Sequence, residues 1–330
     1  MPSERRLLVL STADVEQLLD IDLAIESQRR AFDALGRGSA LLPARLLVEG
    51  REDSVAFCYA ARLTPDSGAV CKFGSVNPGN ADRGLPAVSA LVTVLDEDDG
   101  RPVAIMDGTS VSTIRTSAAS AVAVAALADP DARRMAVLGS GVQAEAHVRA
   151  ISRVLGLTSV RVSGRDPARC ASLARSLDEE FEFEVIAAAG SEEAVRDADV
   201  VVACTTSVDP VLETAWLKPG ATVVSIGSFA PNRSEVPQDL LTRAGAVVVD
   251  DVDTAAEHAG PIVQGLASGL LAKDRLISLG EVVAGRAPGR TSSSEIVYYN
   301  SVGIGVQDAA AAAAVVEAAR VRGHGQTISL

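Results

Sequence analysis

Apolar and polar residues alternate with different rhythms in the two parts of the chain. In roughly the first third, short apolar runs are separated by clusters of Gly, Pro and Asp. These runs predict strands at residues 7–10, 45–48, 55–61, 69–73 and 85–95. Because several of these strands follow one another without a helix between them, we expect a mostly antiparallel sheet.

Helical spacing marks four further stretches of the chain. We expect helices over residues 11–19, 21–35, 111–128 and from about 301 onward. The third, "VSTIRTSAASAVAVAALA", ends at Asp129-Pro130, and the last contains the run "VQDAAAAAAVVEAARVRG". We expect the third helix to link two domains and the last one to return to the first domain.

From Met135 onward, apolar strands alternate with helical stretches. The predicted strands are at residues 135–138, 160–163, 184–187, 199–204, 222–226 and 246–250. This alternation is typical of an α/β protein with a doubly wound parallel sheet, the Rossmann architecture. The sequence therefore predicts a Rossmann domain over residues 118–302 and a smaller α+β domain formed by residues 1–117 with 303–330.

A glycine-rich turn follows the first strand of the alternating part, in "MAVLGSGVQAEAHVRAI". Gly139-x-Gly141-x-x-Ala144 matches the fingerprint that holds the pyrophosphate of a dinucleotide at a helix N-terminus. A strand-to-helix turn without a ligand is the alternative, but the alternating context favours a nucleotide site. We expect cofactor contacts from the turn and from the polar end of the strand at 199–204, namely Gly139, Ser140, Gly141, Val142, Gln143, Thr205, Thr206 and Ser207.

The end of the second Rossmann strand bears on the choice between NAD and NADP. In "VRVSGRDPAR" the strand closes at Ser163, where NAD-binding units usually carry an Asp or Glu for the ribose hydroxyls. Arg165 and Arg169 can instead pair with a 2′-phosphate. The sequence therefore favours NADP(H) over NAD(H). The alternative makes Asp166 the ribose ligand, although its place before Pro167 is typical of a helix cap.

Composition narrows the class of protein. The net charge of −13 argues against a nucleic-acid partner, whose phosphates would be repelled. The four cysteines and three histidines are scattered without metal-ligand spacing, so we expect reduced thiols and no metal. We also expect a cytoplasmic protein without a membrane partner, because the N-terminus does not resemble a signal peptide and residues 118–128 are too short for a span.

Several stretches together resemble the ornithine cyclodeaminase/mu-crystallin family. They include "VCKFGSVNPGNADRGLPAVSALVTVLDEDDGRPVAIMDG", "TSVSTIRTSAASA", "VLGSGVQAEAH", "LKPGATVVSIGS" and "YYNSVGIGVQDAAAAA", in order over nearly the whole chain. The resemblance implies a homodimer joined through a substrate domain built from both chain ends. It also implies hydride transfer between a nicotinamide cofactor and an imine or amine beside a carboxylate.

The resemblance also assigns roles to residues. It implies that Arg45, Lys72 and Arg115 surround a substrate carboxylate, with Lys72 and Arg115 as catalytic residues and Lys72 able to relay a proton. Guanidinium groups grip a carboxylate in two places, which suits this role. Without the resemblance, Arg45 reads as a surface arginine, whereas a charge at Lys72 or Arg115 needs a partner. Ser228, Val302 and Gly303 are expected beside the cofactor. Asp308 is expected to be a local structural residue, with contact to the substrate as the alternative.

One position departs from the family pattern. Cyclodeaminases carry an aspartate that binds the substrate amine, and the matching position here, in "SIGSFAPNRSEVP", is Phe229. A phenyl ring cannot act as a base, so we expect it to form an apolar wall beside the substrate or simply to pack in the core. The sequence thus predicts an NADPH-dependent reductase of a cyclic imine bearing a carboxylate. Two alternatives stay open: a dehydrogenase or cyclodeaminase-like enzyme of secondary metabolism, and an NADPH-binding protein without turnover.

Overall fold

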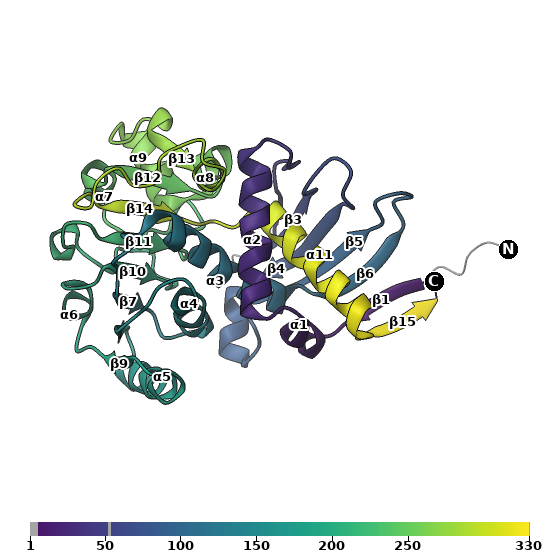
Figure 1. The fold of residues 1–330 in the computed structure, drawn as a ribbon, viewed down its shortest axis with the longest axis horizontal. Helices are drawn as coiled ribbons and strands as arrows, with labels where there is room; N and C mark the ends of the chain where they lie inside the picture. Colours follow the sequence, from purple (N-terminus) through teal and green to yellow (C-terminus); the bar gives the residue numbers. More distant parts are fainter. Residues whose placement is uncertain (1–5, 52–53, 330) are drawn as a thin grey trace. The chain divides into compact units, whose positions relative to one another are not determined.

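The computed structural model describes residues 6–51 and 54–329, and side chains 81 and 82 are not described. The chain forms two compact units (Figure 1). The first unit runs to Arg115 and takes up the chain again at Ile304, and the second covers Thr116–Gly303. Helix α3 (Gly108–Leu127) carries the chain from the first unit into the second.

The first unit contains a seven-stranded sheet in the order β15-β1-β6-β5-β4-β3-β2. Its central strands pair antiparallel, as predicted, and only β1 and β6 pair in parallel. The strands are β1 (Arg6–Leu10), β2 (Leu46–Glu49), β3 (Val55–Ala61), β4 (Val70–Val76), β5 (Val88–Leu95), β6 (Pro102–Asp107) and β15 (Gln326–Ser329). The helices are α1 (Thr12–Leu18), α2 (Ile21–Gly36) and α11 (Gly305–Arg322), with a 3₁₀ turn over Pro78–Arg83.

The two faces of this sheet differ in their surroundings. Helix α11 lies against α2 and crosses β4 and β3, so one face of the sheet is covered (Figure 1). Strand register places Lys72 beside Tyr59 and Val92 on the same face, and Val92 is completely buried. The opposite face carries a row of neighbouring side chains that includes Phe73, which is 62% exposed. This row consists of Leu46, Cys58, Phe73 and Leu91.

The second unit contains an eight-stranded sheet in the order β13-β12-β14-β11-β10-β7-β8-β9, and every strand pair is parallel. This confirms the predicted doubly wound sheet. The strands are β7 (Arg134–Leu138), β8 (Ser159–Ser163), β9 (Glu184–Ala187), β10 (Val200–Ala203), β11 (Thr222–Ser225), β12 (Ala246–Val249), β13 (Leu276–Ser278) and β14 (Val297–Asn300). Strands β10, β11, β12 and β14 are buried throughout.

Seven helices and two 3₁₀ turns connect these strands within the described residues. They are α4 (Val142–Ser152), α5 (Pro167–Glu180), α6 (Ser191–Val195), α7 (Asp239–Arg243), α8 (Val252–His258), α9 (Gly260–Ser268) and α10 (Leu279–Val283), with turns at Thr214–Trp216 and Lys273–Arg275. The sheet order reverses its direction of growth between β7 and β10. Ligands of open α/β sheets bind at such a switch point, next to the carboxyl ends of the strands.

Four strands of the structure were not predicted, namely β6, β13, β14 and β15. Each is only three to six residues long. Strand β15 is exposed at every position, so burial leaves no alternating pattern there. The long helix also begins at Gly108 rather than 111, where the Asp107 carboxylate accepts a 2.8 Å hydrogen bond from the Ser110 amide.

Helix α3 has the length and apolar composition of a membrane span. Two-thirds of its most apolar window is buried inside the protein, however, as in the core helix of a soluble protein. The helix is rich in small residues, Ala, Ser and Gly, which allow neighbouring elements to approach closely. A β-carbon at Gly108, for example, would lie 3.0 Å from atoms of Ala90 in β5.

Candidate active site

Lys72 is buried in the first unit although it is a charged residue. It stands on β4 with only 3% of its surface exposed. Its Nζ forms an ion pair with Asp308 Oδ2 at 2.7 Å, although the angles of this contact are not those of a hydrogen bond. The same Nζ donates a 3.1 Å hydrogen bond to Ser112 Oγ. The ammonium also lies 5.1 Å from the centre of the Tyr59 ring. Lys72 therefore has both a counter-ion and an aromatic wall.

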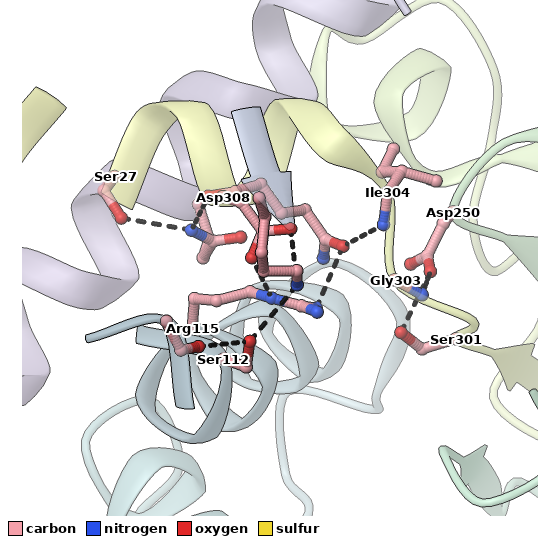
Figure 2. Close-up of polar contacts among 12 residues, drawn as sticks. Ser27, Ser112, Arg115, Asp250, Ser301, Gly303, Ile304 and Asp308 are labelled. Atoms are coloured by element: carbon pink, nitrogen blue, oxygen red, sulfur yellow. Dashed lines mark hydrogen bonds and ion pairs between the residues drawn. The ribbon is translucent and has the colours of Figure 1, made fainter. Parts of the chain in front are cut away.

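Arg115 shares the counter-ion of Lys72. Its Nε donates a 3.0 Å hydrogen bond to Asp308 Oδ1, and Nη1 donates one of 3.2 Å to Gln307 Oε1. Figure 2 shows the Arg115 side chain pointing toward Asp308 in the first turn of α11. The structure thus brings together Lys72 from β4, Arg115 from α3 and Asp308 from α11. The sequence analysis missed this role of Asp308, because only the returning helix α11 places it there.

The electrostatics of this cluster act in opposing directions. Burial lowers the pKa of Lys72, the nearby charges of Arg115 and Arg45 lower it as well, and Asp308 opposes them, so that the resulting pKa is about 8. The pKa of Asp308 is lowered although burial alone would raise it, because Lys72 and Arg115 both stabilise the carboxylate. The cluster therefore holds a firmly ionised Asp308 and a lysine whose proton can leave near neutral pH.

Arg45 adds a third cation to the same region. Its guanidinium lies 5.2 Å from the centre of the Tyr59 ring, and Nη1 lies 3.4 Å from the Tyr59 hydroxyl. Two buried donors here, Arg45 Nη2 and Gln307 Nε2, have no hydrogen-bond partner among the described residues. Buried donors are rarely left unpaired, so they are suited to an incoming acceptor such as a carboxylate.

The second unit has a cavity of about 570 Å³ at the switch point of its sheet. Residues 138–141, 163–166, 169, 190–191, 204–207 and 211 line it. Gly139 has φ +131°, and a β-carbon there would lie 2.7 Å from the Cys204 carbonyl oxygen. A β-carbon on Gly141 would meet nothing within 4 Å, and the N-terminus of α4 has no side-chain cap. This open cradle of backbone amides fits the pyrophosphate of a dinucleotide.

The cavity is also lined by the residues that are predicted to determine the preference between NAD and NADP. Ser163 is buried at the end of β8, and the exposed Arg165 and Arg169 line the cavity. The Asp166 carboxylate accepts hydrogen bonds from the amides of Ala168 (3.0 Å) and Arg169 (3.1 Å), so it caps α5 as predicted. Neither arginine forms an ion pair with any described residue.

Glu235 fixes the loop that carries Thr205, Thr206 and Ser207. Its Oε1 accepts hydrogen bonds from the amide and the hydroxyl of Thr205, and Oε2 accepts from Ser225 Oγ and the Gly227 amide. Burial raises the pKa of Glu235, while these hydrogen bonds oppose the rise. No sequence signal identifies Glu235, since it follows a loop without periodicity. Its effect is to join the ends of β10 and β11 beside the cavity.

Asp250 organises the last segment of the second unit. Its Oδ2 accepts hydrogen bonds from Ser301 Oγ (2.9 Å) and from the Gly303 amide (2.8 Å) (Figure 2). The same oxygen accepts a hydrogen bond from the Val302 amide (2.8 Å), and the Tyr299 hydroxyl donates to Oδ1. The amides of Val302 and Gly303 are therefore already used within the protein. A carboxylate directly after an apolar parallel strand was the available sequence signal for this group.

The remaining predicted residues lie in different surroundings. Val142 is exposed, whereas Ser228 is completely buried, with its hydroxyl bonded to Ser225 and to the Glu235 amide. The Gln143 carbonyl contacts the His147 ring nitrogen, and its side-chain Oε1 is buried without a described partner. Phe229 is 39% exposed, and the Arg233 guanidinium lies 5.0 Å from its ring centre.

Residues 5–323 match the model of the ornithine cyclodeaminase/mu-crystallin family. The chain belongs to this family. It is 32% identical to an alanine dehydrogenase of Archaeoglobus fulgidus over 97% of this chain and 98% of the relative.

Solved structures agree with this assignment over the full fold. A Thermococcus litoralis Δ1-pyrroline-2-carboxylate reductase in complex with NADH and L-proline superposes with a TM-score of 0.93 at 29% identity, covering 97% of this chain and 100% of that one. An archaeal alanine dehydrogenase dimer with bound NAD gives a TM-score of 0.93 at 30% identity, covering 98% and 99%. The protein is accordingly an NAD(P)-dependent oxidoreductase of the class that acts on imines.

Proposed function

We propose that this protein is an NADPH-dependent reductase of a cyclic imine that carries a carboxylate next to the C=N bond. Pyrroline- and piperideine-2-carboxylate are the simplest such substrates. The observation that carries the proposal is the cluster of buried Lys72 and Arg115 with half-buried Arg45. Although one carboxylate, Asp308, already occupies this cluster, the buried donors Arg45 Nη2 and Gln307 Nε2 stay unpaired. A small anionic substrate fits such a site.

The residues of the first unit perform two tasks in this proposal. Arg45 and Arg115 bind the substrate carboxylate and so fix the orientation of the imine. Lys72 donates the proton that the imine nitrogen gains on reduction, which suits an amine with a pKa of about 8. A bound nicotinamide supplies the hydride to the imine carbon. Hydride plus proton convert C=N into CH–NH and leave Lys72 to be reprotonated by water.

The preference for NADPH rests on the far end of the cavity. Ser163 offers no carboxylate to repel a 2′-phosphate, and Arg165 and Arg169 have no described counter-ion that would compete with that phosphate. Asp166, the residue that could hold the ribose of NAD, is instead bonded to two amides of α5. A nicotinamide cofactor agrees with the NADH and NAD bound by two of the relatives. The preference for the 2′-phosphate of NADPH is proposed for this chain from its own residues.

Phe229 bears on the type of reaction. A cyclodeaminase needs a group that takes a proton from the substrate amine, and a phenyl ring cannot do so. We therefore favour an imine reductase over an ornithine cyclodeaminase, with Phe229 as an apolar wall for the substrate ring. An amino-acid dehydrogenase acting on an open-chain imine is the second candidate, because an alanine dehydrogenase is among the relatives.

We also propose a cytoplasmic homodimer. Three residues of the row, Leu46, Phe73 and Leu91, are exposed and form an apolar stripe across one sheet face, with the half-buried Cys58 among them. Exposed apolar patches of this kind often mark protein–protein interfaces. A second copy would bury this stripe against its own. The described cysteines are free, as expected in a reducing compartment, although Cys58 and Cys71 bring their sulfurs to 3.4 Å.

Cofactor oxidation at 340 nm tests the proposal. NADPH and NADH are offered with pyrroline-2-carboxylate, piperideine-2-carboxylate, and pyruvate plus ammonia, and NAD⁺ is offered with ornithine. We expect the fastest turnover with NADPH and a cyclic imine, and its loss in Arg115→Ala. Turnover restricted to ornithine with NAD⁺ would contradict both the substrate and the cofactor. Tight NADPH binding without turnover of any imine would favour a binding protein.

A further inference from the structure

We propose that Asp308 is a positioning residue of the active site, whose two carboxylate oxygens hold Lys72 and Arg115 together and keep the Lys72 amine in its proton-donating form. This inference rests on the proposed function. It assigns a working role to a residue that the sequence analysis expected to be a local structural one.

The first turn of α11 is held firmly in place. The Ile304 amide donates a 2.8 Å hydrogen bond to Gln307 Oε1, which also accepts from Arg115. A β-carbon on Gly305 would lie 3.0 Å from the Ala60 carbonyl oxygen, so the helix start packs directly on β3. Asp308 is 1% exposed, and its position is set by the backbone of α11. A carboxylate fixed in this way can orient two longer and more flexible side chains.

The division of the two oxygens explains how one carboxylate serves two cations. Oδ1 accepts the Arg115 Nε hydrogen bond at 3.0 Å, and Oδ2 pairs with Lys72 Nζ at 2.7 Å. Arg45 keeps its unpaired Nη2 for a substrate. Without Asp308 the buried cations would repel one another, and no other carboxylate among the described residues pairs with Lys72 or Arg115.

The groups that face Lys72 come from four elements. Asp308 approaches from α11, Arg115 and Ser112 from α3, Tyr59 and Phe57 from β3, and Arg45 lies near the start of β2. Burial and the two guanidinium groups favour the neutral amine, and Asp308 is the anion that opposes them. Removing its charge should therefore cause the amine to lose its proton at a lower pH.

The experiment follows Lys72 directly. The sequence contains only three lysines, Lys72, Lys218 and Lys273. NMR of the full-length protein with ¹³Cε-labelled lysine should therefore give three signals, and Lys72→Met identifies the signal of Lys72. We expect Asp308→Asn to lower the titration midpoint of Lys72 by about one pH unit or more. Glu317→Gln, an exposed charge removal on the same helix, is the matched control and should leave the midpoint unchanged.

The pH profile of kcat/KM for imine reduction provides the second readout. In the wild type, the rate should fall as the pH rises past about 8, and Asp308→Asn should move that fall to lower pH. A purely structural role would lower the rate equally at every pH and leave the Lys72 midpoint in place. Either of these results in a folded Asp308→Asn protein would overturn the inference.

Arg115→Met tests the cluster without touching Asp308. It removes a cation that lowers the pKa of Lys72, so the Lys72 midpoint should rise, opposite to the effect of Asp308→Asn. If Asp308→Asn does not fold, the inference is tested by comparing the Lys72 midpoint of Arg115→Met with that of the wild type. A Lys72 midpoint that stays unchanged or falls in Arg115→Met overturns the inference. If no imine is reduced but the NMR midpoints move as expected, the proposed function fails while the role of Asp308 in holding the proton stands.

Discussion

Lys72 and Asp308 form a 2.7 Å ion pair in the interior of the first unit, although they come from opposite ends of the chain. Strand β4 supplies the lysine and the returning helix α11 supplies the carboxylate. Burying two charges costs free energy, and such pairs are rarely needed for stability alone. Their position beside Arg115 and Arg45 agrees with the proposal that the pair takes part in the chemistry of the site.

The first prediction concerns the proton on Lys72. Replacing Lys72 with Met removes the donor, and we expect imine reduction to fall by about 10²- to 10⁴-fold. Lys72→Arg keeps a positive charge but does not give up a proton near neutral pH, so it should not restore the rate. Cofactor binding, followed by NADPH fluorescence, should be retained in both variants. A Lys72→Met enzyme with more than a tenth of wild-type activity would rule out the assigned role.

The glycine cradle gives a matched pair of variants. Gly141→Ala places its β-carbon in open space, so it should leave the unfolding temperature nearly unchanged. It should weaken cofactor binding at least about tenfold, because the methyl group fills the space of the pyrophosphate. Gly139→Ala instead strains a backbone at φ +131° and should also lower stability by about 1–3 kcal/mol. Thermal unfolding and isothermal calorimetry measure both. Undiminished cofactor affinity in Gly141→Ala would place the dinucleotide elsewhere.

The third prediction addresses the choice of cofactor. Ser163→Asp introduces a carboxylate at the end of β8, where it repels a 2′-phosphate and can bind ribose hydroxyls. We expect the ratio of kcat/KM for NADPH over NADH to fall by about 10- to 100-fold. Arg165→Ala should weaken NADPH by a similar factor and leave NADH unaffected, since it removes one charge-assisted contact. Equal effects on the two cofactors would argue against a 2′-phosphate site.

His147 predicts a loss of stability in mild acid. Burial lowers its pKa to about 4, and its ring contacts the Gln143 carbonyl at 2.7 Å and Ser120 Oγ at 2.9 Å. In the unfolded chain this histidine has its ordinary pKa of about 6.5, so it binds a proton more readily there than in the folded protein. The free energy of unfolding is therefore highest above pH 6.5 and declines as the pH falls toward 4, by up to about 3 kcal/mol. Urea unfolding between pH 7.5 and 4.5 measures this loss.

The matched control for this prediction is a second histidine. His147→Gln should flatten the pH dependence, whereas His324→Gln, at a partly exposed histidine 3.8 Å from Asp14, should preserve it. An equally steep loss of stability in His147→Gln would assign the effect to other groups.

The exposed stripe on the first sheet predicts the oligomeric state. Phe73→Glu places a charge in the middle of the row, and we expect it to convert a dimer into a monomer in size-exclusion chromatography with light scattering. Val321→Glu changes another exposed apolar residue of the same unit and should leave the dimer intact. A wild-type protein that is already monomeric at micromolar concentration would refute the assigned interface.

The sequence by itself determined the elements with strong periodicity. Alternating strands and helices from Met135 specify a doubly wound parallel sheet, because each buried strand must be covered by its neighbouring helices. The glycine turn at Gly139 was readable for the same local reason, since its backbone conformation and its close approach to Cys204 exclude a side chain. Asp166 as a helix cap also depends only on its immediate neighbours.

Only the tertiary structure decided which distant residues meet. Asp308, Glu235 and Asp250 stand in the sequence without any partner, and each receives its hydrogen bonds from segments that the fold brings close. The short strands β13, β14 and β15 likewise form because a neighbouring strand offers unpaired backbone groups. Such contacts depend on chain closure over long separations, and local propensity does not encode them. The charged cluster at Lys72 is therefore a property of the folded unit, although the sequence already marked Lys72 and Arg115 as charges that need a partner.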